Sequence, residues 1–123
     1  MKIKTLAIIV IIIAAGLVAG LVWYFYFGPG AKVVVVMGTS ADYPPFEFIA
    51  ENGSIVGFDV DIAKYIANKY GWTLEIKDIA FEGLIPALQA GEIDMIVAAM
   101  TITPGREEVV DFSIPYYNAS QGI

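Results

Sequence analysis

Arg106 is the residue whose type and position most clearly indicate binding chemistry. It is the only arginine in the chain, and it lies near the start of a short helix expected after Thr103 and Pro104. The helix dipole disfavours a cation at that end, and an anionic ligand would relieve this. A guanidinium also binds a carboxylate through two parallel hydrogen bonds. The position therefore favours a carboxylate ligand; the alternative is a surface ion pair with Glu107 or Glu108.

Aromatic side chains in two other loops can complete such a site. Tyr43 lies in the loop of residues 39–46, and Phe81 lies in the loop of residues 80–83. Two aromatic walls and one guanidinium suit a small zwitterion that carries a carboxylate. Thr101 adds a hydroxyl and a backbone N–H close to Arg106. The alternative for these residues is structural, as partly exposed core aromatics and a threonine at a strand end.

These loops follow three predicted strands. Lys32–Gly38 contains four consecutive valines, which is typical of a parallel strand buried on both faces. Trp72–Ile79 alternates apolar and polar residues, and Asp94–Met100 is another buried run. Ligands of open parallel sheets bind beyond the carboxyl ends of the strands. The three loops are therefore expected to meet at one edge.

A hairpin and a helix are expected between the first two strands. After a loop of residues 39–45, Phe46–Ile49 and Ile55–Phe58 flank Asn52-Gly53, a strong hairpin turn. Apolar spacing predicts a helix over Asp59–Tyr70, which ends at Gly71. Asp59 and Asp61 fall in its first turn, where the helix dipole accounts for both, so no metal site is expected there.

Two further helices complete the expected order of β, hairpin, α, β, α, β, α, β. One is predicted over Gly83–Ala90, with Pro86 in its first turn and Gly91 as its stop. The other begins at Pro104, and a last extended piece begins at Phe112. Alternating strands and helices predict an α/β fold with a mostly parallel sheet and right-handed crossovers.

The first 30 residues form a separate segment. No charged residue lies between Thr5 and Ala31, and this apolar run is long enough to cross a bilayer as a helix. Lys2 and Lys4 keep the N-terminus in the cytoplasm and send the remainder outside. The aromatic run of residues 23–27 favours a retained anchor, and a cleaved signal peptide is the alternative. We expect an anchor or signal over residues 1–30 and a globular lobe over residues 31–123.

Composition excludes several classes of function. The mean hydropathy is +0.70, most of it from the N-terminal run. The residues after position 31 include five basic and thirteen acidic side chains. The resulting net charge of −8 disfavours nucleic-acid binding. The absence of His and Cys removes most transition-metal sites and the usual nucleophilic triads. No phosphate-binding glycine motif is present, so neither a metal nor a cofactor is expected.

Five ordered segments begin at residues 38, 57, 81, 91 and 101 and read GTSADYPPFEF, GFDVDIA, FEGLIPAL, GEIDMI and TITPGREEVVDFS. Together they cover about residues 33–118. They resemble the extracellular solute-binding proteins of family 3, the polar amino-acid receptors of ABC transporters. The resemblance implies a periplasmic-binding-protein-like (type II) lobe, one of two that close on an amino acid. It also implies a permease partner and no enzymatic activity.

The resemblance also assigns roles to the candidate residues. Arg106 would bind the α-carboxylate of the ligand, helped by the backbone N–H of Thr101. The carbonyl of Ala99 and the hydroxyl of Thr101 would receive the α-amino group. Tyr43 and Phe81 would stack on the ligand side chain.

The chain departs from the family pattern at two points. Ser40, also a candidate ligand contact, stands where receptors for basic amino acids and glutamine often carry Asp, which weakens the case for Arg, Lys or His as ligand. The second lobe is absent, so the sequence is interpreted as a truncated form of a longer protein. A lone lobe is expected to bind weakly, at about millimolar affinity or worse, because half of the contacts are missing.

Two other functions remain open at this stage. The same lobe occurs beside membrane segments in ionotropic receptors and sensor kinases, which a retained anchor would fit. Cyclohexadienyl dehydratases and membrane-bound lytic transglycosylases also resemble the fold. Glu47 and Glu82 are candidate acid–base groups for a dehydratase, although a hairpin and a loop position explain them equally well.

Overall fold

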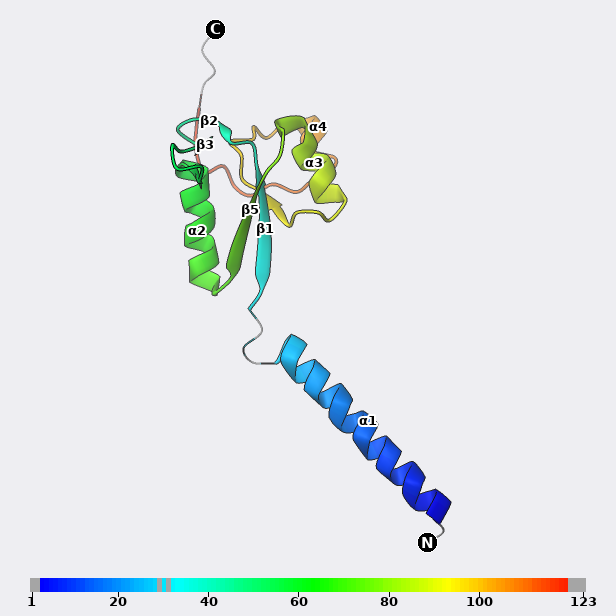
Figure 1. The fold of residues 1–123 in the computed structure, drawn as a ribbon. Coiled ribbons are helices and arrows are strands. Elements are labelled where there is room, and N and C mark those ends of the chain that lie inside the picture. Colours follow the sequence, from blue (N-terminus) through cyan, green and yellow to red (C-terminus); the bar gives the residue numbers. More distant parts are fainter. Residues whose placement is uncertain (1–2, 29, 31, 120–123) are drawn as a thin grey trace. The chain divides into compact units, whose positions relative to one another are not determined.

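The computed structural model describes residues 3–28, 30 and 32–119, and the chain divides into two compact units, residues 1–33 and 34–123. The first unit contains α1, Ile3–Phe27, a helix of 25 residues with no buried side chain (Figure 1). Among the described residues it is the one helix long and apolar enough to cross a membrane. A signal sequence near the N-terminus meets the same criteria of length and composition.

A parallel three-stranded sheet forms the centre of the second unit. β1, Val34–Thr39, lies between β5, Thr73–Asp78, and β6, Met95–Ile96. Val34 pairs with Thr73 and Thr39 pairs with Asp78, while Gly38 pairs with Ile96 on the other side. All three strands run in the same direction, so their carboxyl ends share one edge (Figure 1). The expected α/β fold with a parallel sheet is confirmed.

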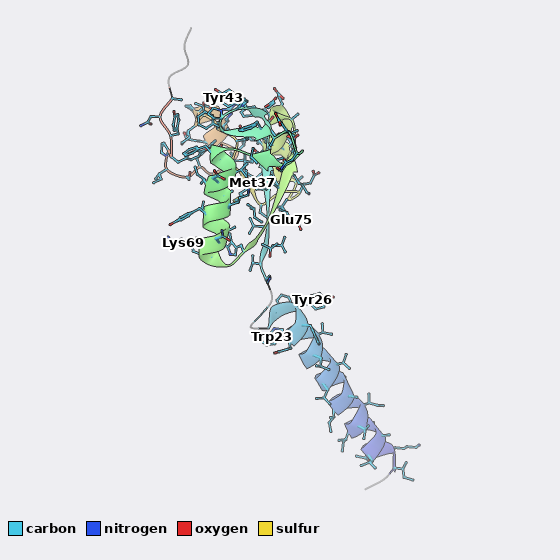
Figure 2. The ribbon with its side chains drawn as sticks, turned by 60° about the vertical axis from the view of Figure 1, so that its left-hand side comes forward. Trp23, Tyr26, Met37, Tyr43, Lys69 and Glu75 are labelled. Carbon is cyan, nitrogen blue, oxygen red and sulfur yellow. The ribbon has the colours of Figure 1, made fainter. Side chains whose placement is uncertain are left out.

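Successive residues of β1 face different helices, as the alternation of a strand requires. Met37 is fully buried with Val60 and Ala63 of α2, Phe58–Tyr70. The next residue, Gly38, faces Leu84 of α3, Phe81–Gln89. Figure 2 shows Met37 between α2 and the sheet. Both helices thus pack against the central strand, β1.

A small antiparallel sheet connects β1 to α2. β3, Glu47–Ile49, pairs with β4, Ile55–Val56, as the hairpin prediction requires. The hairpin turn is closed by Asn52, whose side-chain oxygen accepts a hydrogen bond of 3.0 Å from the backbone N–H of Ser54. β2, Asp42–Tyr43, adds a third strand inside the segment that was expected to be a loop.

The short helix α4, Pro104–Glu107, forms as predicted. Thr103 is its N-cap, and the Oγ1 of Thr103 accepts a hydrogen bond of 3.4 Å from the backbone N–H of Arg106. The glycine stop of α2 at Gly71, in a left-handed conformation, is also confirmed.

Three expectations about the elements were wrong. α3 begins at Phe81, so Pro86 is its sixth residue and does not lie in the first turn. β6 ends at Ile96, and Ala99, which lies inside the strand expected over residues 94–100, has a φ of 43° that no strand can accommodate. The last extended piece has no strand pairing within the described residues up to 119.

Gly57 is expected to be essential for the junction between the hairpin and α2. Its φ is 133°, and an added Cβ would overlap the backbone carbonyl of Phe46. Gly57→Ala should therefore reduce the free energy of unfolding by about 3 kcal/mol or more. Gly53→Ala is the matched control, since Gly53 also has a positive φ, 82°, but faces open space; it should cost about 1 kcal/mol. Urea unfolding followed by circular dichroism measures both, and equal losses would contradict the role of the Phe46 carbonyl.

Candidate ligand-binding site

A cavity of about 550 Å³ lies beyond the carboxyl ends of the strands. This volume lies within the range of small-molecule sites. Three parts of the second unit line it: the β2 region, the loop after β6 and the segment that precedes the last described residue. The lining residues are Tyr43, Phe46, residues 99–102 and residues 112–119.

Aromatic rings form one wall of this cavity. Tyr43 stacks on Phe46 with ring centroids 5.6 Å apart and an interplanar angle of 12°. Tyr117 meets the same Phe46 ring edge-on at 5.1 Å. Figure 2 shows Tyr43 at one end of the second unit and Lys69 at the other. The wall presents π-faces that can stack on a planar group or accept a cation.

The guanidinium of Arg106 is held by neutral groups. Its Nη1 donates a hydrogen bond of 2.7 Å to the carbonyl of Thr101, and its Cζ lies 5.3 Å from the centroid of the Phe81 ring. Neither partner is an acid, so neither neutralises the positive charge. Because a guanidinium carries five N–H donors, this arrangement fixes the group and leaves donors for an anion. The alternative, an ion pair of Arg106 with Glu107 or Glu108, is not among the contacts that hold the guanidinium.

Three of the six predicted site residues line the cavity, and Arg106 and Phe81 lie next to these three without lining it. Tyr43, Ala99 and Thr101 line the cavity. Arg106 joins them through the Thr101 carbonyl, and Phe81 joins them through Arg106.

Ser40, like Arg106 and Phe81, does not line the cavity. It is buried, and its hydroxyl donates a 3.2 Å hydrogen bond to Oδ1 of Asp42.

Asp59 is a site-supporting residue that the sequence interpretation missed. Its side chain is fully buried, and its Oδ2 accepts hydrogen bonds from the backbone N–H of Ala99 and, at 2.8 Å, from the hydroxyl of Tyr116. The helix dipole alone therefore does not account for it. A signal was available, since Asp59 shares its helical face with Ala63 and Ala67, both buried, whereas Asp61 is exposed.

Glu47 lies beside Asp59 and is only 1% exposed. Burial raises the pKa of Glu47 to about 8, helped by the charge of Asp59 and by a hydrogen bond between the two carboxyl groups. Glu47 is thus protonated at neutral pH and can donate to Asp59. Desolvation and the hydrogen bond to Asp59 also raise the pKa of the Tyr116 hydroxyl above its ordinary value. The other proposed acid, Glu82, is exposed.

The cavity also has lining residues to which the sequence analysis gave no site role: Phe46, Met100, Ile102 and residues 112–119. Within the described residues, no group of three or more His, Cys, Asp or Glu side chains could hold a metal ion.

A family model and a curated relative match this chain. The model of the bacterial extracellular solute-binding proteins, family 3, matches residues 35–123. The arginine-binding extracellular protein ArtP of Bacillus subtilis (strain 168) is 48% identical over 92 residues, which are 75% of this chain and 36% of ArtP. The chain therefore spans little more than a third of that relative.

Solved structures match the same region. The arginine-bound form of domain 1 from TmArgBP, an arginine-binding protein of T. maritima, is 55% identical with a TM-score of 0.69 and covers 72% of this chain and 71% of that one. An ancestral arginine-binding protein, solved with arginine and with glutamine, is 52% identical with a TM-score of 0.68 and covers 70% of this chain and 38% of that one. These neighbours confirm the expected type II lobe.

The raised pKa of Glu47 makes the stability of the second unit depend on pH. Between the unfolded pKa of 4.5 and the folded value of about 8, the folded state keeps a proton that the unfolded state has lost. The free energy of unfolding should therefore fall as pH rises through this window, by a few kcal/mol in total, and level off above it.

Glu47→Gln should remove most of this fall, because a glutamine amide donates to Asp59 at every pH. Glu51→Gln is the control, since Glu51 is exposed in the turn of the same hairpin. Urea unfolding between pH 5 and pH 9 measures the slopes. A Glu47→Gln slope equal to that of Glu51→Gln would contradict the assignment of the buried proton.

Proposed function

The chain belongs to the bacterial extracellular solute-binding proteins, family 3, and from this premise we propose that it forms the first lobe of an extracytoplasmic amino-acid receptor. The observation that carries the proposal is the guanidinium of Arg106, held by the Thr101 carbonyl and the Phe81 ring beside a cavity of about 550 Å³. Since neither partner is an acid, the α-carboxylate of an amino acid would complete the site.

The proposed contacts divide between the two ends of the ligand backbone. Arg106 and the backbone N–H of Thr101 bind the α-carboxylate. The carbonyl of Ala99 and the hydroxyl of Thr101 bind the α-amino group. This division is supported by the position of Ala99 and Thr101 on the wall of the cavity.

Aromatic residues would bind the ligand side chain. Tyr43, stacked on Phe46, offers a flat wall inside the cavity. Phe81 has the guanidinium of Arg106 near its ring, so its contact with the ligand would use the remaining surface of the ring. Phe81 would then act both on the ligand and on the orientation of Arg106.

We propose arginine as the ligand. The names of the relatives support it, and so does the chemistry of the lobe: aromatic faces bind guanidinium groups, and the net charge of −8 after residue 31 attracts a cation. The expectation drawn from Ser40 pointed away from arginine. Ser40, however, is buried and hydrogen-bonded to Asp42. Its residue type is therefore a weak argument about which amino acid binds. Glutamine is the main competitor, because an ancestral relative also binds it.

The remaining proposals concern partner and location. An ABC transporter permease would receive the amino acid after a second lobe has closed on it. α1 would keep the lobe outside the cytoplasm, either as a membrane anchor or as a cleaved signal. Its 25 residues, which carry no charge after Lys4 and are preceded by Lys2, support both alternatives.

Arg106→Ala tests the proposal directly. Calorimetric titration of the full chain in detergent micelles with L-arginine should show saturable binding, near millimolar because one lobe supplies half of the contacts. The variant should lose about a hundredfold in affinity, as expected when a charge-assisted bidentate pair is removed. Lys69→Ala is the control, because this exposed cation lies at the far end of α2 (Figure 2). Unchanged binding by Arg106→Ala, or no binding by the native chain, would contradict the proposal.

A further inference from the structure

Two fully buried acidic side chains lie in contact next to the cavity. Glu47 comes from β3 and Asp59 from the first turn of α2, and their exposed fractions are 1% and 0%. Oε2 of Glu47 and Oδ1 of Asp59 are buried without a hydrogen-bond partner. Burial of a polar group is costly unless it is paired, so this arrangement calls for a specific reason.

One shared proton makes the pair possible. Asp42 of β2 and Tyr116 of the C-terminal segment are the other titratable groups that face it, and Asp42 adds further negative charge. Two ionised carboxylates in this place would repel each other strongly. The raised pKa of Glu47 reduces this repulsion, and Oδ2 of Asp59 accepts hydrogen bonds from two donors.

The donors that Asp59 accepts from belong to the ligand cavity. They are the backbone N–H of Ala99 and the hydroxyl of Tyr116, and both residues line the cavity. Ala99 is the one non-glycine residue of the described chain with a positive φ, 43°. This conformation costs about 1–2 kcal/mol for an alanine, and the hydrogen bond to Asp59 holds it in place.

We propose that Asp59 is a positioning residue for the ligand, which fixes the backbone of Ala99 so that the Ala99 carbonyl and the Thr101 N–H face the amino acid. The inference rests on the proposed function, because it assumes that residues 99–101 contact an amino acid. Asp59 itself would not touch the ligand. Glu47 supports it by donating the shared proton.

Asp59→Asn tests the role of the carboxylate. An asparagine offers one acceptor oxygen to three donors, namely Ala99, Tyr116 and protonated Glu47. In the full chain in detergent micelles, the variant should bind L-arginine at least about tenfold more weakly at pH 6. Asp61→Asn is the matched control, two residues further along α2 and exposed, and should bind like the native chain. Circular dichroism confirms that each variant is folded.

Glu47→Gln provides a second readout that a purely structural role would not move. The affinity of the native chain should fall severalfold between pH 6 and pH 9, as Glu47 ionises beside Asp59. Glu47→Gln should retain its pH 6 affinity over this range, whereas the exposed Glu51→Gln should follow the native chain. Titration of the ligand α-amino group is common to all three proteins and cancels in the comparison.

The outcomes separate the two proposals. If the native chain binds L-arginine, but Asp59→Asn binds within twofold of Asp61→Asn, the inference is wrong. The same holds if Glu47→Gln and Glu51→Gln show the same pH profile. If the native chain does not bind any amino acid, the proposed function itself fails, and the inference fails with it.

Discussion

The parallel pairing of β1 with β5 on one side and β6 on the other determines where the rest of the lobe must lie. Because the three strands run in one direction, the chain leaves all of them at the same edge. Two acidic side chains add separate hydrogen bonds, one to the backbone of β1 and one to the loop that follows it. Oδ1 of Asp78 accepts a 2.9 Å hydrogen bond from the N–H of Ala41, and Oδ2 of Asp94 accepts one of 2.8 Å from the N–H of Val36. The loops that form the candidate site thus begin at a sheet whose strands are held in place by hydrogen bonds.

Buried polar groups then fix the conformation of the loops that follow these strands. Asp59 connects the start of α2 to Ala99 and to Tyr116, two segments about forty and sixty residues further along the chain. A carboxylate in this place costs desolvation free energy, and the proton on Glu47 offsets part of it. The lobe therefore uses a strained alanine and an acid pair where a purely apolar core would pack more simply. Such departures are typical of binding sites.

The sequence predicted the regular parts of the fold well, because periodicity and glycine stops are local signals. The parallel sheet, the hairpin turn at Asn52 and the cap of α4 at Thr103 are confirmed. One failure involves a long-range contact. Ala99, inside the strand expected over residues 94–100, has a positive φ and donates its N–H to Asp59, forty residues earlier in the chain. No local pattern around residue 99 carries that information.

The same distinction applies to the candidate site. Arg106, Tyr43 and Phe81 stay predictions, drawn from residue types that have few structural roles in loops. Phe46 and residues 112–119 line the cavity and Asp59 supports it, but each has an ordinary local explanation in the sequence. Ser40 also stays a prediction; its hydrogen bond to Asp42 cannot be read from its position in a loop.

The central claim is that an amino acid binds beside Arg106, and a nuclear magnetic resonance titration of the isotope-labelled chain with L-arginine tests it most directly. The account predicts saturable shifts of the Ala99 and Thr101 backbone amides and of the Arg106 Nε–H, with no shift at Tyr65 on the exposed face of α2. Shifts confined to other residues, or none at the cavity up to tens of millimolar ligand, would contradict it.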